Sequence, residues 1–288
     1  MRNITEDNLT EAVISAMQNT QDARLKEVMT SLIKHLHAFI REVQPNDEEW
    51  MAGIQFLTDT GKLCDENRQE FILLSDALGV TALKDALNNP QMEGLTEATV
   101  LGPFYRVGSP EVPQMYNIAG NIEGDPVVVY GKVTDLDKAP IAGACLDIWQ
   151  ATGDGFYDVQ LESMDGEMGL RGKIRTDAQG NYIFRTIKPS SYPIPHDGTV
   201  GNLLKQLGRH PYRPAHIHFI VSADGYKPVI TQLFVEGDVY LESDAVFGVR
   251  DSLVVNFEKI DSLDEAARFG VKTPFYKVHY NFVLKNAH

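Results

Sequence analysis

The N-terminal third of the chain carries apolar side chains at helical spacing. Across residues 25–43 they recur at i, i+3, i+4 and i+7, which predicts an amphipathic helix. The stripe comprises Leu25, Val28, Met29, Leu32, Ile33, Leu36, Ile40 and Val43. Pro45 and Asn46 interrupt it. The acidic residues 47–49 suit the first turn of a second helix that continues through Leu57.

Two shorter helical patterns follow before the character of the sequence changes. The spacing predicts a helix over 65–79 and another over 82–87. Near Gly102-Pro103 the helical pattern stops, and residues 108–126 are rich in Gly, Pro and Asn. This composition is typical of an extended connector between domains.

Beyond the connector, apolar and polar residues alternate as in strands. The predicted strand segments are 127–133, 144–150, 173–176, 181–186, 216–222, 229–235, 252–260 and 279–284. Asp177-Ala178-Gln179-Gly180 has the composition of a hairpin turn. Many short strands separated by turns indicate an antiparallel β-sandwich. We therefore predict a mainly β protein, with a helical N-terminal domain over 1–105 and a β-sandwich catalytic domain over 106–288.

Composition narrows the class of protein without identifying a function. The chain is 43% hydrophobic and 23% charged, which is ordinary for a globular protein. Its net charge of −14 argues against nucleic acid and anionic membranes as partners. No uncharged apolar run approaches the ~20 residues needed to span a bilayer. A polar, acidic N-terminus and only two cysteines favour the cytoplasm as the location.

Two histidines in one predicted strand are the first candidates for chemistry. Side chains alternate faces along a strand, so His216 and His218 point the same way and Ile217 and Phe219 point the other way. Two neutral imidazoles that converge are a common nucleus of a metal site. The alternative is a chance pair on a solvated strand face.

Two tyrosines lie in loops that restrict the backbone. Tyr157 follows a turn in Gly153-Asp154-Gly155-Phe156-Tyr157-Asp158, and Tyr192 lies among three prolines in the segment 189–195. The chain has eleven tyrosines, so the pattern alone does not select these two. Either could equally be a half-buried aromatic residue with a solvated hydroxyl.

The motifs around these residues resemble a known family. Gly-Asp-Gly-Phe-Tyr-Asp, Tyr-Pro-Ile-Pro and Arg-Pro-Ala-His-Ile-His, in this order, resemble the intradiol ring-cleaving dioxygenases. The resemblance extends over nearly the whole chain, through the N-terminal helices, the junction at 101–104 and the predicted sandwich. It implies an enzyme that uses non-haem Fe(III) to open catecholic rings between the two hydroxyl-bearing carbons.

The resemblance also implies roles for individual residues. The implied iron ligands, for one Fe(III) per subunit, are Tyr157, Tyr192, His216 and His218. Phenolate oxygens suit a hard trication, and although free tyrosine titrates near ~10, a bound cation can deprotonate it. By the same resemblance the diol displaces Tyr192, which then serves as a base. Arg213 stabilises negative charge on the ring, and Gln232 orients the substrate or oxygen.

The implied substrate pocket is mostly apolar, as a planar ring requires. Its positions are Leu73, Asp76, Val100, Leu101, Gly102, Pro103, Phe104, Ile194, Pro195, Arg213 and Val246. Asp76 is the exception, because a carboxylate in an apolar pocket needs a donor, and an additional ring hydroxyl would supply one. With Val246-Phe247-Gly248-Val249 it resembles the branch of the family that cleaves hydroxyquinol (benzene-1,2,4-triol) to 3-hydroxy-cis,cis-muconate. The alternatives are cleavage of catechol or chlorocatechol, and for Asp76 a solvated place on the outer face of its helix.

The N-terminal apolar stripe must be buried against something. It could pack within one chain. The resemblance instead implies a homodimer through these helices, with a phospholipid in an apolar tunnel. The candidate lining residues are Leu9, Val13, Met17, Leu25 and Met29.

Two other classes of protein compete with this interpretation. A non-enzymatic β-sandwich binding module with attached helices would have no need for the tyrosines and histidines at this spacing. A zinc hydrolase could use His216, His218 and a carboxylate such as Asp197 or Asp224, although no His-Glu-x-x-His motif accompanies them.

Overall fold

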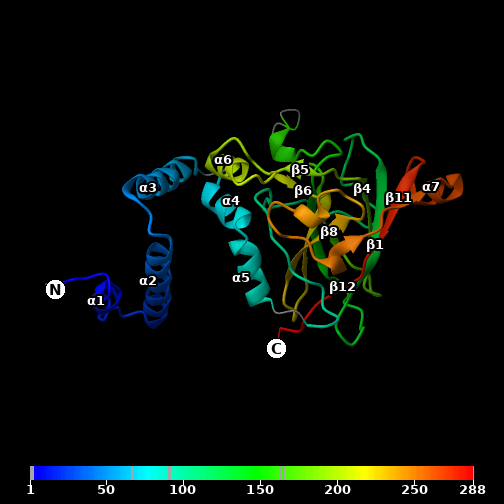
Figure 1. Cartoon of the computed structure of the whole chain (residues 1–288). Helices are drawn as coiled ribbons and strands as arrows, with labels where there is room; N and C mark the ends of the chain where they lie inside the picture. Colours follow the sequence, from blue (N-terminus) through cyan, green and yellow to red (C-terminus); the bar gives the residue numbers. More distant parts are fainter. Residues whose placement is uncertain (1–2, 66–67, 90–91, 162–163, 165, 288) are drawn as a thin grey trace. The chain divides into compact units, whose positions relative to one another are not determined.

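Figure 1 shows the computed structural model of the chain. It describes residues 3–65, 68–89, 92–161, 164 and 166–287. The chain divides into two compact units, Met1–Asp59 and Thr60–His288. No helix among the described residues is long and apolar enough to cross a membrane. The division into domains after residue 105 stays a prediction.

The first unit consists of helices. They are α1 (Leu9–Ala16), α2 (Ala23–Val43) and the start of α3 (Asp47–Lys62). The two predicted helices are confirmed, and α1 is an additional one. Asp22 begins α2, because its carboxylate accepts hydrogen bonds from the backbone N–H groups of Arg24 and Leu25.

The apolar stripe of α2 is present but incompletely covered. Leu25 is 50% exposed, Leu36 48% and Phe39 55%. Among the described residues of α1 and α2, none is buried. Packing within the chain therefore leaves much of this apolar surface in contact with solvent.

In the second unit, the end of α3 is followed by two short helices, α4 (Glu70–Ala77) and α5 (Val80–Asn88). Both occur where helices are predicted, but the first is shorter than 65–79. Gly79 separates them in the left-handed conformation, with φ 73°. Leu73 and Ala77 of α4 are buried, so the inner face of this helix belongs to the core of the unit.

Two five-stranded sheets and a two-stranded ribbon form the β part of the described chain. The first sheet contains β1 (Pro126–Thr134), β4 (Asn181–Ile187), β10 (Glu258–Ile260), β11 (Phe275–His279) and β12 (Phe282–Val283). The second, in the order β3-β2-β7-β8-β9, contains Arg171–Arg175, Cys145–Gln150, His216–Ser222, Val229–Val235 and Val254–Val255. The ribbon pairs β5 (Tyr192–Pro193) with β6 (Tyr212–Arg213).

The two sheets pack face to face across one apolar core. Val129 and Phe184 of the first sheet share this core with Ile148 and Phe219 of the second. The ring centroid of Phe219 lies 6.2 Å from that of Phe184 and 5.0 Å from that of Phe282. The outer face of the second sheet is left free to carry polar side chains.

The predicted antiparallel arrangement is only partly right, because the sheets are mixed. Strand β1 pairs in parallel with β11 and β12, and β8 pairs in parallel with β9. The turn at 177–180 forms, with the Gly180 N–H 3.0 Å from the Asp177 carbonyl, but the predicted hairpin is wrong. It joins β3 of the second sheet to β4 of the first. A turn motif fixes the chain reversal locally but does not decide which sheet each flanking strand joins.

The structure also differs from the predicted elements near the C-terminus and before β6. The predicted strands 252–260 and 279–284 are each interrupted. Helices α6 (Thr199–Gln206) and α7 (Leu263–Phe269) were not expected from the pattern. Helix α7 covers the outer face of the first sheet, where Ala266 and Phe269 pack with Val128 and Phe275 of the strands.

Candidate active site

Three adjacent strands place a row of side chains on the outer face of the second sheet. In the strand register, His218 of β7 lies opposite Trp149 of β2 on one side and Gln232 of β8 on the other. His216 lies on the same face, two residues earlier. Both histidines are 1% exposed, whereas Ile217 and Phe219 point into the core between the sheets. The predicted alternation is confirmed, and the solvated alternative is wrong.

The tips of four side chains meet above this row. The Nε2 atoms of His216 and His218 are 3.0 Å apart, and His218 Nε2 is 3.0 Å from Tyr157 Oη. The hydroxyls of Tyr157 and Tyr192 are 3.3 Å apart. The structure therefore brings together all four residues that the sequence suggested as metal ligands.

Tyr157 reaches the cluster because its loop is fixed at several points. It begins the short 3-10 helix η1 (Asp158–Gln160), and its backbone N–H donates to Gln160 Oε1 at 2.9 Å. The next residue, Asp158, accepts two hydrogen bonds from Arg171, at 2.7 and 2.6 Å. Arg171 also donates to the Phe104 carbonyl at 2.7 Å, which ties the 101–104 junction to the same loop.

Tyr192 is held by the β5–β6 ribbon, in which it lies opposite Arg213. The turn before Tyr157 also supports it. A Cβ added at Gly155, where φ is 85°, would lie 3.0 Å from Tyr192 Cβ. Only glycine combines this backbone conformation with so close an approach. The Gly-Asp-Gly motif thus serves both tyrosines.

Flat aromatic contacts hold the cluster in place. Trp149 stacks on His218 with ring centroids 4.6 Å apart and planes 9° apart. Phe104 stacks on Tyr157 at 4.3 Å and 18°. These rings exclude water from one side of the donor atoms, and Trp149 is a site residue that the sequence analysis missed.

Without a bound metal, burial favours the uncharged forms of both histidines and both tyrosines. Burial, followed by the charge of Arg213, lowers the pKa of His216 to about 3, and burial also holds the pKa of His218 far below its usual value. Burial raises the pKa of both tyrosine hydroxyls. His216 Nδ1 lies 2.7 Å from the Pro214 carbonyl, which assigns its proton to Nδ1 and leaves the lone pair on Nε2 facing the cluster.

This donor set fits a metal ion. Ligand atoms at ~2.1 Å from one ion and roughly 90–110° apart are separated by about 3.0–3.4 Å, and the three tip-to-tip distances given above fall in this range. Two imidazole nitrogens and two phenol oxygens, which a cation deprotonates, suit a hard, highly charged ion.

The competing zinc site lacks its third ligand. Across the described ranges, no three His, Cys, Asp or Glu side chains gather as a metal site. Asp197 instead accepts two hydrogen bonds from Arg68, at 3.0 and 2.9 Å.

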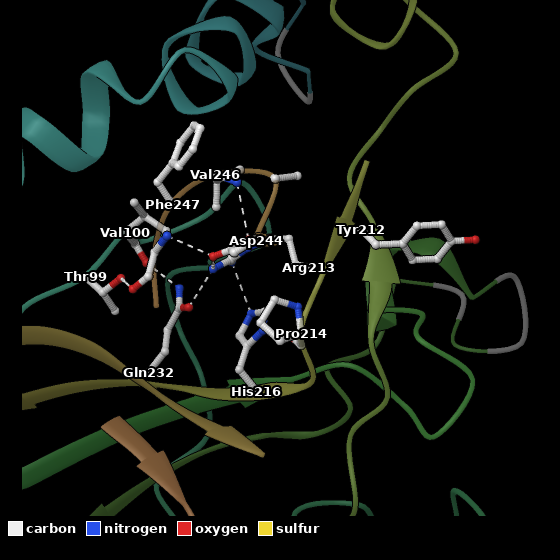
Figure 2. Close-up of polar contacts among 12 residues, drawn as sticks. Thr99, Val100, Tyr212, Arg213, Pro214, His216, Gln232, Asp244, Val246 and Phe247 are labelled. Carbon is white, nitrogen blue, oxygen red and sulfur yellow. Dashed lines mark hydrogen bonds and ion pairs between the residues drawn. The ribbon is translucent and has the colours of Figure 1, made fainter. Parts of the chain in front are cut away.

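Arg213 lies beside the cluster in a buried polar network (Figure 2). Its Nη1 is 3.2 Å from His216 Nε2, and its Nη2 donates to Gln232 Oε1 at 2.8 Å. Gln232 in turn donates to the Val100 carbonyl at 2.6 Å. Asp244 completes the network through Arg213.

Asp244 is a site residue that the sequence patterns did not predict. It lies 31 residues from Arg213, so no local motif joins the two. The one available signal is general: a buried arginine needs a carboxylate as its partner.

Most of the predicted pocket residues belong to two packed groups or line a cavity. Leu73, Val100, Ile194 and Val246 form one buried apolar cluster, and Leu101 and Phe104 pack on the tyrosines. Gly102 approaches His218 closely, since an added Cβ would lie 3.2 Å from its Cε1. Leu73, Pro103, Phe104 and Pro195 also line a cavity of about 990 Å³.

Asp76 is 4% exposed, so its solvated alternative is wrong. It lies on α4 between Leu73 and Ala77, both members of the apolar cluster. Within the described structure its Oδ1 is buried without a hydrogen-bond partner. Burial raises the pKa of this carboxyl, and Thr81 and Arg213 offset part of the effect.

Comparisons with known proteins agree with this geometry. Residues 100–286 match a family model described as "Dioxygenase", and residues 22–96 match one described as "Catechol dioxygenase N terminus". The chain is 46% identical to hydroxyquinol 1,2-dioxygenase of Rhizobium sp., over 97% of this chain and 95% of that protein. It is 50% identical to 6-chlorohydroxyquinol 1,2-dioxygenase of Cupriavidus pinatubonensis, over 88% and 92%.

A solved structure gives the same result for the fold. Hydroxyquinol 1,2-dioxygenase of Pseudomonas putida superposes with a TM-score of 0.91 at 43% identity, over 98% of each chain. With two family models spanning most of the sequence and relatives this similar, the chain is an enzyme of the intradiol ring-cleavage dioxygenase family.

Proposed function

We propose that the protein is a hydroxyquinol 1,2-dioxygenase. It would cleave benzene-1,2,4-triol with O2 between the carbons that carry the 1- and 2-hydroxyls. The product would be 3-hydroxy-cis,cis-muconate, the enol form of maleylacetate. The relatives named above act on this triol or its 6-chloro derivative, and intradiol cleavage belongs to the degradation of aromatic compounds.

The observation that carries the choice of substrate is the buried carboxylate of Asp76. Its Oδ1 has no partner among the described residues, although it lies in an otherwise apolar cluster. A buried acceptor without a donor costs about 1–3 kcal/mol. The 4-hydroxyl of the triol would supply that donor, whereas catechol has no hydroxyl at this position.

We propose Tyr157, Tyr192, His216 and His218 as the ligands of one Fe(III) per subunit; non-haem iron is characteristic of the family. Ferric iron bound there would supply a Lewis acid for the two diol oxygens and so activate the ring toward O2. The donor spacing supports this ligand set, as does burial of every donor.

The chain's own residues would handle protons, charge and orientation. Tyr192 Oη, in its deprotonated form, is the base for a diol proton. Arg213 presents a fixed positive charge next to His216 and stabilises negative charge that develops on the ring. Gln232 is fixed by Val100 and Arg213, so it can orient substrate or oxygen. Phe104 and Trp149 exclude water from the donor atoms.

Oxygen uptake on hydroxyquinol, catechol and a chlorocatechol tests the proposal. We expect the highest kcat/KM on hydroxyquinol and one iron per chain by emission spectroscopy. A preference for catechol or chlorocatechol would support the alternative of a catechol 1,2-dioxygenase. An iron-loaded protein that consumes no oxygen with any of them would contradict the proposed substrate class.

We also propose a homodimer formed through the N-terminal helices and, within it, a phospholipid beside Leu9, Val13, Met17, Leu25 and Met29. The half-exposed apolar stripe of α2 supports this, because a second copy would remove it from water. Analytical ultracentrifugation measures the dimer, and mass spectrometry of an organic extract detects the lipid.

The cytoplasmic location of the protein stays a prediction.

A further inference from the structure

Arg213 and Asp244 form an ion pair inside the protein. Both residues are nearly inaccessible, with 2% and 5% exposure. Asp244 Oδ1 accepts from Arg213 Nε at 3.0 Å, and Oδ2 accepts from Nη2 at 3.2 Å. A buried guanidinium without a carboxylate is strongly destabilising, so Asp244 is the group that allows Arg213 to be buried here.

Asp244 is itself fixed by the backbone of its own loop. Its carboxylate accepts hydrogen bonds from the N–H groups of Val246 at 3.3 Å and Gly248 at 2.8 Å. A Cβ added at Gly248 would lie 2.8 Å from Arg213 Nη2 and 3.1 Å from Asp244 Oδ2. The loop therefore closes on the ion pair with no space for a side chain, and the same loop carries the pocket residue Val246.

The hydrogen bonds of Arg213 leave one end of the guanidinium for the reaction. Asp244 and Gln232 occupy its Nε and Nη2 groups. The remaining Nη1 group faces His216 Nε2 at 3.2 Å. A metal bound to that lone pair would leave Nη1 without this acceptor, at the edge of the donor cluster and free to stabilise negative charge there. Figure 2 shows the guanidinium held between Asp244, Gln232 and His216.

We propose that Asp244 is a positioning residue that orients Arg213, so that only Nη1 faces the substrate. This inference rests on the proposed dioxygenase function and extends it to a residue outside the ligand set and the pocket. Burial alone would raise the pKa of Asp244, but Arg213 outweighs it and holds the pKa below its usual value, so the pair stays ionised. A fixed pair of this kind needs no reorganisation as negative charge develops on the ring.

The variant Asp244→Asn, in the iron-loaded full chain, tests this role. We expect kcat on hydroxyquinol to fall about 10- to 100-fold, somewhat less than loss of an oriented donor causes. KM should change by less than about threefold, because the effect lies in the transition state. Iron content and the visible absorption band should match the parent protein. The metal-free variant should melt at a lower temperature, because Arg213 is left without its carboxylate.

Asp238→Asn is the matched control. Asp238 is a carboxylate that supports the link between β6 and β7, since it accepts from the Ala215 N–H at 2.9 Å, and it makes no hydrogen bond or ion pair with Arg213 in the described structure. We expect its kcat to stay within about threefold of the parent value. An equal fall of kcat in both variants would show that Asp244 has only a general structural role, and would overturn the proposal.

A double-mutant cycle shows whether Asp244 acts through Arg213. In an Arg213→Gln background, Asp244→Asn should lower kcat by less than about threefold, because the group that it positions is gone. Independent, multiplicative losses would overturn the proposal, as would an unchanged kcat in Asp244→Asn.

Gly248→Ala keeps the test decisive if Asp244→Asn does not fold. It removes no charge but presses a methyl group on Arg213 Nη2, so kcat should fall with an unchanged iron band. An unaffected kcat in this variant counts against the inference. An iron-loaded parent without dioxygenase activity would instead reject the proposed function, so the two failures can be distinguished.

Discussion

Trp149 lies flat against His218, with ring planes 9° apart and centroids 4.6 Å apart. The two residues face each other across neighbouring strands, so the register of the sheet makes the contact. The indole limits rotation of the imidazole, and thereby keeps His218 Nε2 directed at the other three donors.

Truncation of this indole should therefore affect both stability and metal binding. We expect Trp149→Ala to lower the free energy of unfolding by about 3–5 kcal/mol and to reduce the iron bound per chain. The chain's other tryptophan provides the control, because Trp50 is 53% exposed. Trp50→Ala should change stability by about 0.5 kcal/mol at most and leave iron content unchanged. Denaturant unfolding and emission spectroscopy measure the two effects.

The two tyrosines should determine the colour of the iron-loaded protein. A phenolate bound to Fe(III) absorbs visible light, so the purified protein should be red. Tyr157→Phe and Tyr192→Phe should each shift this absorption band and severely impair turnover. Tyr182→Phe is the control, because Tyr182 is also buried but donates to the Tyr280 carbonyl instead. A spectrum that is identical in all three variants would exclude the tyrosines as ligands.

Local patterns predicted the histidine strand well. Side chains alternate between the two faces of a strand, so the sequence of β7 alone shows which residues share a face. The tyrosines differ, since Tyr157 and Tyr192 come from loops and only the resemblance selected them. Asp244 and Trp149 were missed because their roles depend on partners in other elements. The roles of the predicted site residues stay predictions until such variants are measured.

The fold shows the same division between local and distant information. The pairing of β1 with β11 joins segments far apart in the sequence, and no local signal specifies that it is parallel. Helix α7, in contrast, does have local signals at both of its ends. Ser262 caps it by accepting from the Glu265 N–H at 3.2 Å, and Gly270 ends it in the left-handed conformation.

Asp76 should distinguish the triol from catechol. We expect Asp76→Ala to lower kcat/KM for hydroxyquinol about 10- to 100-fold more than for catechol, because only the triol has a hydroxyl for this carboxylate. Ile72→Ala is the control on the same helix, since Ile72 is 52% exposed and is not one of the predicted pocket residues. An equal loss on both substrates would remove Asp76 from the argument about specificity.

Arg68 bridges two carboxylates of very different exposure. Glu70 is fully buried and accepts from Arg68 Nε at 2.9 Å, whereas the side chain of Asp197 is 75% exposed. Glu70→Ala should cost about 1–3 kcal/mol, because the buried N–H of Val200 loses its acceptor, whereas Arg68 keeps Asp197 as a partner. Asp197→Ala should cost less than about 1 kcal/mol at pH 7, because solvent screens an exposed pair.

The effect of Asp197 should also depend on pH. The hydrogen bond from Arg68 holds the pKa of Asp197 below its usual value. Its contribution is therefore complete above the unfolded pKa of about 4 and is lost as the pH falls through the lower folded value. Denaturant unfolding of the parent and Asp197→Ala should converge in strongly acidic buffer. A difference that grows on acidification would contradict the assignment.

Gly155 and Gly225 both have left-handed backbones, but only Gly155 lies against another side chain. Alanine variants at the two positions therefore distinguish the cost of the backbone conformation from the effect of the close contact. A Cβ at Gly155 would lie 3.0 Å from Tyr192 Cβ, whereas a Cβ at Gly225 has no neighbour within 4 Å. Both alanine variants should pay about 1–3 kcal/mol for the backbone conformation. Only Gly155→Ala should also displace Tyr192, shift the visible band of the iron-loaded protein and lower kcat. If Gly225→Ala produced the same spectral shift, the change would report general loss of stability, and the Gly-Asp-Gly turn would have no specific part in placing the tyrosine.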